Sequence, residues 1–310
     1  MAEARIHTEA PGVTRIDHGW GGPGFIASYL VDDGGELALV EAGPESTREA
    51  LLAGIRAAGH DPADLAHVLL THIHLDHAAA AGRLAQIAPN AQVHVHPLGA
   101  RHLADPSRLL ASAARLYGDR MQELWGTMLP VPAGRIRTPA DGDAIRVGGR
   151  SLVALETPGH AAHHFAFHDP DAGLVFTGDV GGIRLAGARH VRPPTPPPEV
   201  DTPAWLASID RLRALEPRML LPTHFGGIND AAWHLDDLEA RLRDWTARAS
   251  TAGDPAALAA DLRRRGDAEL LAATGDADLV RRYAESIPYD MMAAGLLRQA
   301  RTRAQAPAAD

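Results

Sequence analysis

The sequence contains no cysteine among its 310 residues. This absence excludes disulfide bonds, thiolate metal ligands and a cysteine nucleophile. A Gly-x-Ser-x-Gly turn is also missing, which argues against a serine nucleophile of that kind. Any metal site in this chain must therefore be built from histidine and carboxylate side chains.

Long hydrophobic runs and clusters of basic residues are absent as well. No stretch approaches the roughly 20 apolar residues that cross a bilayer, and the first residues lack the apolar region of a secretory signal. The formal net charge is -9, and no run of Lys or Arg forms a patch for nucleic acid. These features predict a cytoplasmic protein whose partner is a small-molecule substrate, with no nucleic acid and no membrane.

The balance of residues is that of a globular protein. Hydrophobic residues make up 45% of the chain and charged residues 22%. The length favours one large domain with appendages over several small domains.

Runs of β-like sequence alternate with turn signals in both halves of the chain. Strands are predicted at residues 25–31, 37–40, 67–71, 92–96, 144–147, 152–157, 165–168, 174–177 and 219–222. Helical sequence follows each β-rich half, so the pattern predicts an α/β layered sandwich.

Several helix boundaries carry local signals. Ser46 and Glu49 have the spacing of a capping box, and Gly59 suits the end of that helix. Thr202 is the predicted N-cap of a later helix with Pro203 in its first turn. Other helices are predicted at 78–87, at 106–128 and from 223 onward, and the proline-rich residues 191–203 are predicted to be a surface connection.

These segments suggest a domain organisation. We expect a catalytic domain at residues 1–228 with a helical insertion at about 105–130, a helical extension at 229–300 and a disordered tail at 301–310. One face of the extension carries Leu235, Leu238, Leu242 and Trp245 at helical spacing. This face could pack against the domain or against a second subunit, so a homodimer is possible.

The segment THIHLDH, residues 71–77, holds three histidines and an aspartate directly after the apolar run 68–70. In a strand, His72 and His74 would point the same way and could meet one cation. Asp76 and His77 would lie just past the strand end, where a turn could aim them at a neighbouring point. One loop could thus contribute to two adjacent ions, although each ion would need further ligands.

Three other predicted strand ends offer such ligands. His160 follows Thr157-Pro158-Gly159, Asp179 follows Thr177-Gly178, and His224 follows Pro222-Thr223. Loops at one edge of a layered sheet commonly converge on a site.

The four motifs THIHLDH, TPGH, FTGD and PTH occur in the order and approximate spacing of the metallo-β-lactamase superfamily, which the chain resembles from about Thr14 to Gly226. The resemblance implies an αββα four-layer sandwich and two divalent metal ions, with zinc favoured and manganese or iron as alternatives. It implies that His72, His74 and His160 bind the first metal, that Asp76, His77 and His224 bind the second, and that Asp179 binds both.

Two divalent cations about 3.5–4 Å apart can lower the pKa of a shared water and provide a hydroxide nucleophile. We therefore expect hydrolysis of an ester, thioester or lactone, with Asp76 and Asp179 as the catalytic residues. A mononuclear iron enzyme of the persulfide dioxygenase type is an alternative, as is β-lactam hydrolysis as a side activity. A non-catalytic binding protein in which the metals are structural remains a third hypothesis.

Some residues near these motifs have open roles. Glu41 stands where the superfamily usually has Asp, which affects the support of the ligand loop more than metal binding itself. His94, His96 and His164 are expected not to bind metal. The stripe of Tyr117, Met121, Trp125 and Met128 could pack in the core or line a substrate pocket.

Overall fold

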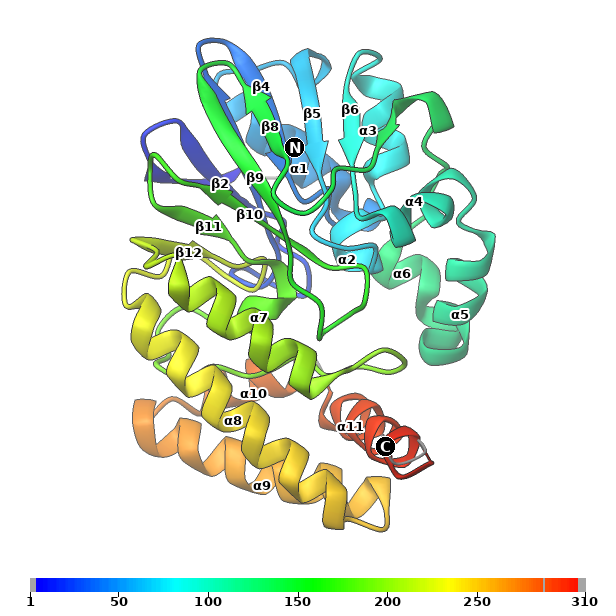
Figure 1. Cartoon of the computed structure of the whole chain (residues 1–310), viewed down its shortest axis with the longest axis vertical. Coiled ribbons are helices and arrows are strands. Elements are labelled where there is room, and N and C mark those ends of the chain that lie inside the picture. The colour runs from blue at the N-terminus through cyan, green and yellow to red at the C-terminus, as the bar shows by residue number, and fades with distance from the viewer. Residues whose placement is uncertain (1–3, 287, 306–310) are drawn as a thin grey trace.

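A computed structural model of the protein describes residues 4–286 and 288–305. Two β-sheets stack face to face, and helices cover their outer faces (Figure 1). The seven-stranded sheet has the order β1(Arg5–Ala10), β2(Val13–Asp17), β3(Ala27–Asp33), β4(Glu36–Val40), β5(Leu65–Leu69), β6(Gln92–His94), β7(Ile136–Arg137). The five-stranded sheet has the order β12(Met219–Leu221), β11(Leu174–Phe176), β10(Phe165–Asp169), β9(Arg150–Glu156), β8(Ala144–Val147).

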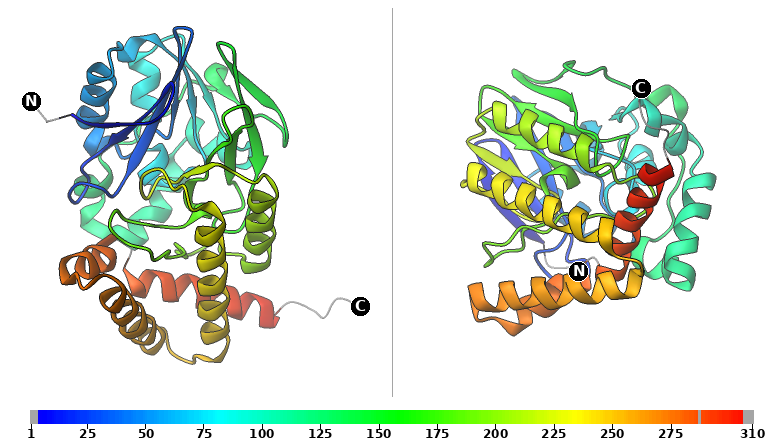
Figure 2. Two further views of the ribbon diagram at one scale, coloured as in Figure 1. Left: turned by 90° about the vertical axis from the view of Figure 1, so that its left-hand side faces the viewer. Right: turned by 60° about the horizontal axis from the view of Figure 1, so that its bottom comes forward.

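The helices fall into three groups along the chain. Those of the first group are α1(Arg48–Ala57), α2(Leu75–Ala78), α3(Ala81–Ile87), α4(Pro97–Ala104), α5(Ser107–Tyr117) and α6(Met121–Trp125). The outer face of the smaller sheet carries α7(Thr202–Ala214) and α8(Ala231–Thr251), and the chain continues with α9(Pro255–Thr274), α10(Ala277–Ser286) and α11(Tyr289–Gln305). Figure 2 shows these C-terminal helices gathered at one end of the two sheets.

The layers follow from side-chain alternation along the strands. In β3, Tyr29 and Val31 are buried between the two sheets, whereas Leu30 points to the other face and packs with the helical layer. Phe165 and Phe167 of β10 belong to the same inner core, where Phe176 of β11 meets the ring of Tyr29 edge-on at 5.5 Å. The predicted αββα sandwich is confirmed.

The start of α1 differs from the predicted capping box. A short 3-10 turn, Glu45–Thr47, precedes the helix. Thr47 is the N-cap of α1, and its side chain makes no capping hydrogen bond. The Ser46 hydroxyl instead donates to the carbonyl oxygen of Leu124 at 2.7 Å, which ties this turn to α6. The prediction for Gly59 holds, because with φ of +94° it follows the end of α1 and donates its N–H to the Arg56 carbonyl.

Within the proline-rich residues 191–203, positions 191–201 form neither helix nor central strand, as predicted, and α7 begins at Thr202. The predicted surface position was wrong for residues 191–195, which are buried. Arg192 is fully buried, with its guanidinium over the rings of Tyr283 and Tyr289. The C-terminal helices cover this segment, a contact that local composition does not reveal. The N-cap of α7 is Asp201 and not Thr202, and Pro203 lies in the first turn as predicted.

The leucine stripe of α8 packs within the chain. Leu235, Leu238 and Leu242 join the core beneath α7, and Trp245 contacts Tyr289 of α11 at a ring distance of 6.1 Å. The tail prediction was wrong for residues 301–305, because α11 continues to Gln305, and residues 306–310 lie outside the described part. Among the described residues, no helix has the length and apolar character needed to cross a bilayer.

Sequence reasoning also left three strands out. β1 and β2 form an antiparallel pair at the edge of the larger sheet, and β7 adds two residues at the opposite edge. Four of the six residues of β1 are exposed, so its sequence lacks the apolar alternation on which the prediction of a strand depends.

Candidate metal centre

The THIHLDH segment lies at the end of β5 and runs into α2. Because β5 ends at Leu69, His72 and His74 lie in a turn and not in a strand, so the predicted reason for their convergence was wrong. The turn nevertheless brings the rings together, with His72 Nε2 only 2.9 Å from His74 Nδ1. His74 then serves as the N-cap residue of α2, and this short helix carries Asp76 and His77.

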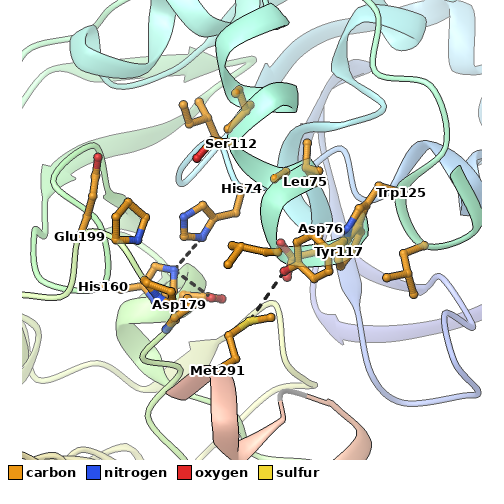
Figure 3. Close-up of a pocket in the computed structure, with 18 of the residues that line it drawn as sticks. His74, Leu75, Asp76, Ser112, Tyr117, Trp125, His160, Asp179, Glu199 and Met291 are labelled. Carbon is orange, nitrogen blue, oxygen red and sulfur yellow. Dashed lines mark hydrogen bonds and ion pairs between the residues drawn. The ribbon is translucent and has the colours of Figure 1, made fainter. Parts of the chain in front are cut away.

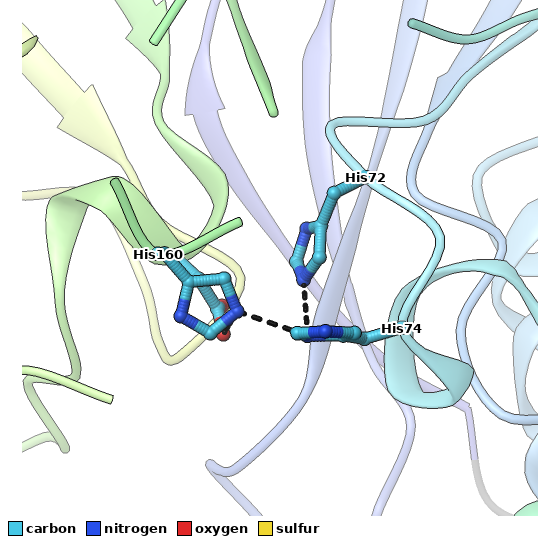
Figure 4. Close-up of side chains that lie close together, drawn as sticks. His72, His74 and His160 are labelled. Carbon is cyan, nitrogen blue, oxygen red and sulfur yellow. Dashed lines mark hydrogen bonds and ion pairs between the residues drawn. The ribbon is translucent and has the colours of Figure 1, made fainter. Parts of the chain in front are cut away.

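All seven predicted ligand residues meet in two neighbouring groups, within each of which the potential ligand atoms lie within 4.8 Å of one another. The first group is His72, His74, His160 and Asp179, and the second is Asp76, His77 and His224. Figure 4 shows the rings of His72 and His74, from one loop, converging with the ring of His160 from another.

Asp179 lies between the two groups. One carboxylate oxygen, Oδ2, is 3.3 Å from Nε2 of His160 in the first group. The other, Oδ1, is 3.2 Å from Nε2 of His77 and 3.3 Å from Nε2 of His224 in the second. Its position therefore suits a carboxylate shared by two cations.

The remaining ligands come from strand ends of the smaller sheet, as the sequence predicts. His160 follows β9, Asp179 lies in the turn after β11, and His224 follows β12. The turn before His160 requires Gly159, which has φ of +142° and leaves no room for a Cβ, since that atom would lie 2.3 Å from Trp205 Cα.

In four of the five ligand histidines, a hydrogen bond on the outer side of the ring determines which nitrogen faces the centre. In His160, Nδ1 lies 2.8 Å from the carbonyl oxygen of Pro194. In His224, Nδ1 lies 2.9 Å from the carbonyl oxygen of Phe25. Since a carbonyl oxygen can only accept, each Nδ1 must donate, which leaves a lone pair on Nε2 of the neutral ring.

His77 follows the same rule, because its Nδ1 lies 3.0 Å from the carboxylate of Glu41. His72 Nδ1 is bonded at 3.0 Å to the Thr71 hydroxyl, whose own proton goes to Glu41. These rings therefore also present Nε2 to the centre.

The donor set fits a divalent metal. Nε2 of His77, Nε2 of His224 and Oδ1 of Asp179 are buried and have no hydrogen-bond partner among the described residues. Buried lone pairs and carboxylates that face each other are costly unless a cation lies between them. Imidazole nitrogen and carboxylate oxygen are the ligands that zinc accepts in the absence of cysteine.

The electrostatics of the two groups differ. Burial, reinforced by neighbouring histidines, holds the pKa of His72 and His74 well below its usual range, so both rings stay neutral. Burial also acts against the charged form of His224, but the carboxylates of Asp179 and Asp76 outweigh it and raise its pKa to about 10. The second group thus has a strong preference for positive charge at its centre.

Glu41 forms hydrogen bonds with both loops that carry His72 and His224. Its buried carboxylate accepts hydrogen bonds from the backbone N–H and hydroxyl of Thr71, from the hydroxyl of Thr223 and from Nδ1 of His77. Thr71 precedes His72 and Thr223 precedes His224, so one side chain positions ligands of both groups. Glu41 holds this place with φ of +68°, a backbone conformation that costs energy for a residue other than glycine.

The other histidines lie outside the two groups. His164 Nδ1 bonds the hydroxyl of Thr157 at 2.9 Å, and its Nε2 accepts from the Val180 N–H at 3.4 Å, so it braces the loops around His160 and Asp179. His94 pairs with His67 at 3.0 Å.

A cavity of about 740 Å³ opens over both groups. All four residues of the predicted stripe pack in or against the helical core, and two of them, Tyr117 and Trp125, also line the cavity. Figure 3 shows Tyr117 beside Asp76, with Met291 of α11 opposite. Sequence reasoning missed Trp20, Phe25 and Met291 as lining residues, because no local pattern links these distant segments.

The family model of the metallo-beta-lactamase superfamily matches residues 21–224. The chain belongs to this superfamily. The match spans every proposed ligand, from His72 to His224.

Relatives within the superfamily differ in their described roles. The chain is 28% identical over 165 residues to a metallo-beta-lactamase fold-containing protein of Sulfurisphaera tokodaii, covering 52% of this chain and 61% of the relative. It is 31% identical over 196 residues to a hydroxyacylglutathione hydrolase of Fuscovulum blasticum, covering 63% and 60%. An atrochrysone carboxyl ACP thioesterase of Aspergillus fumigatus is 25% identical over 209 residues, covering 67% and 39%. The chain therefore spans about three fifths or less of the length of these curated relatives.

A solved structure matches nearly the whole chain. The metallo-beta-lactamase family protein of Thermus thermophilus superimposes with a TM-score of 0.68 at 23% identity, covering 96% of this chain and 95% of the other. At this identity the likeness concerns the fold, and it includes the C-terminal helices.

Proposed function

We propose that the protein is a metal-dependent hydrolase that cleaves an ester, thioester or lactone with the help of two divalent ions, preferably zinc. The observation that carries this proposal is the pair of donor groups joined by Asp179 at the floor of a deep cavity. The hydroxyacylglutathione hydrolase and thioesterase relatives support thioester or ester chemistry.

Bound divalent cations supply Lewis-acid activation of a carbonyl and make a water-derived nucleophile available near neutral pH. The seven side chains would hold these cations, and Asp179, which lies between the two groups, would be shared by both. Asp76 has a carboxylate that is 20% exposed and lines the cavity, so it can orient the nucleophile or pass a proton to the leaving group.

Tyr117 adds a hydrogen-bond donor to this floor. Burial raises the pKa of its hydroxyl, and the carboxylates of Asp76 and Asp179 raise it further, so the group stays protonated. The hydroxyl donates to the Met291 sulfur at 3.9 Å, which is a weak acceptor that a substrate oxygen would replace.

Metal analysis and a substrate panel test the proposal. We expect about two equivalents of zinc per chain, hydrolysis of at least one class among lactones, thioesters and simple esters, and loss of turnover on chelation that added zinc reverses. Asp179→Ala should lose at least 10²-fold in kcat, whereas His94→Ala, which removes a buried histidine outside both groups, should not. Activity that persists after thorough chelation would contradict the proposal.

A further inference from the structure

Aromatic side chains are scarce in this protein, yet several gather in the cavity above the metal groups. The chain has five Trp, five Phe and four Tyr, and Trp20, Phe25, Tyr117 and Trp125 line this one space. Trp20 stacks on Trp125 at 5.3 Å, while Tyr117 meets Trp125 edge-on at 5.1 Å. We call these four residues the aromatic wall.

The aromatic wall is assembled from distant parts of the chain. Trp20 and Phe25 come from the loop between β2 and β3, whereas Tyr117 and Trp125 come from α5 and α6. The indole N–H of Trp20 donates to the carbonyl oxygen of Leu124 at 2.8 Å, which fixes the two parts against each other. A wall tied together in this way is preformed for a ligand.

The mouth of the cavity is also apolar. Among the described residues, four large hydrophobic side chains are exposed, and two of them, Leu98 at 53% and Leu116 at 46%, line this cavity. The other two, Ile6 and Leu271, lie outside its lining. Apolar side chains grouped at the entrance of a pocket are typical of a ligand-binding surface.

Charges in the lining do not favour an ionic ligand of either sign. Apart from the metal groups, Arg101, Arg108 and Arg120 are matched in number by Glu199, Glu285 and Asp290. The main contribution to the binding free energy along the aromatic wall would therefore be the burial of the ligand's apolar surface.

We propose that the cavity binds the long alkyl or aryl group of an acyl substrate, which lies along the aromatic wall between the metal groups and the leucines at the mouth. This inference rests on the proposed hydrolase function and adds the substrate class. Met291 and Ala294 of α11 line the cavity as well, and Met291 lies opposite Tyr117 (Figure 3). The volume of about 740 Å³ exceeds what a small acyl group such as acetyl requires.

Binding of two carboxylic acids to the full, zinc-loaded chain tests the proposal without turnover. Acetate and decanoate carry the same carboxylate, so a difference in their Kd by calorimetry reports contacts of the alkyl chain. We expect decanoate to bind at least 100-fold more tightly. The double substitution Leu98→Ser with Leu116→Ser should weaken decanoate at least 5-fold and leave acetate unchanged.

The other two exposed hydrophobic residues provide a matched control. Ile6→Ser with Leu271→Ser removes similar exposed apolar surface away from the cavity and should leave both affinities unchanged. Equal affinity for the two acids, or equal weakening of decanoate by both double variants, would overturn the assignment of the cavity.

Hydrolysis of decanoyl and acetyl thioesters separates this inference from the proposed function. If decanoate binds as expected and neither thioester is cleaved, nor any lactone or ester of the panel, the hydrolase proposal fails and the cavity assignment stands. If the acetyl thioester is cleaved while decanoate binds no better than acetate, the hydrolase proposal stands and the cavity assignment fails.

Discussion

Glu41 is the residue on which the geometry of both metal groups depends. Its carboxylate joins Thr71, Thr223 and His77, so the length of a glutamate side chain is accommodated at a position where the superfamily usually has aspartate. Hydrogen bonds to a ligand from such a residue fix its orientation and its proton position. Glutamate in place of aspartate at position 41 therefore alters the hydrogen bonds that support the ligand residues and leaves the number of these residues unchanged.

We expect Glu41→Gln to lower zinc affinity about 10- to 100-fold, because the amide cannot accept from all of these donors and carries no charge opposite His77. Competition with a chelator measures the affinity. Glu36→Gln is the matched control at the other end of β4, where the carboxylate contacts His67 outside the metal groups. Unchanged affinity in Glu41→Gln would show that the ligands are held without it.

Tyr117→Phe tests the donor at the floor of the cavity. If the hydroxyl stabilises charge that develops on the substrate, kcat should fall about 10²-fold while KM changes little. Steady-state kinetics on the best substrate of the panel measures the split, and a thermal melt checks that the fold is intact. A rise in KM with constant kcat would instead assign Tyr117 to substrate binding alone.

At the scale of elements, α11 holds the segment that positions His160. Gly295 of this helix packs directly on the backbone of Thr195 and Pro196, and the Thr195 hydroxyl donates to the Met292 carbonyl at 3.1 Å. The neighbouring carbonyl of Pro194 accepts from His160. The C-terminal helix therefore supports a metal ligand as well as one side of the cavity.

Gly295→Ala should destabilise the protein by about 1–3 kcal/mol, because the added Cβ would lie 2.0 Å from the Thr195 carbonyl oxygen. Displacement of residues 194–196 should also weaken zinc binding in the first group. Gly253→Ala is the matched control, since a Cβ there meets nothing within 4 Å. Denaturant unfolding and chelator competition measure the two effects, and equal behaviour of both variants would argue against the role of α11.

At the scale of the whole molecule, several histidines that belong to neither metal group are buried in the neutral form. Burial lowers the pKa of His18 to about 3, that of His190 to about 2 and that of His234 to about 4. The unfolded chain binds these protons near pH 6.5 and the folded chain does not. Each residue therefore contributes stability that is complete above pH 6.5 and is lost as the pH falls towards its folded pKa.

His234→Gln isolates one of these contributions. Between pH 6.5 and 4, His234 should add a slope of about 1.4 kcal/mol per pH unit to the free energy of unfolding, and so about 3 kcal/mol in total. A glutamine amide can still donate to the Gly181 carbonyl that His234 Nε2 contacts, but it does not titrate. Denaturant unfolding at several pH values measures both slopes, and parallel curves for the two proteins would refute the prediction.

Much of the site could be predicted from the sequence because its signals are local. Each ligand follows an apolar run that forms a strand, so the residue type and the strand end lie within a few positions of each other, as at His160 and His224. The capping box of Ser46 failed for the opposite reason. The Ser46 hydroxyl donates instead to the carbonyl oxygen of Leu124, which is 78 residues away. A local sequence pattern cannot predict a contact over this separation.

The sequence by itself determined the layered fold and the seven side chains of the metal groups, because periodicity and strand-end motifs act over short stretches of chain. Only the tertiary structure decided the burial of residues 191–195, the hydrogen-bond partners of Glu41 and the composition of the cavity. These features depend on contacts between segments such as Trp20 and Leu124, 104 residues apart, whose meeting follows from the packing of whole layers.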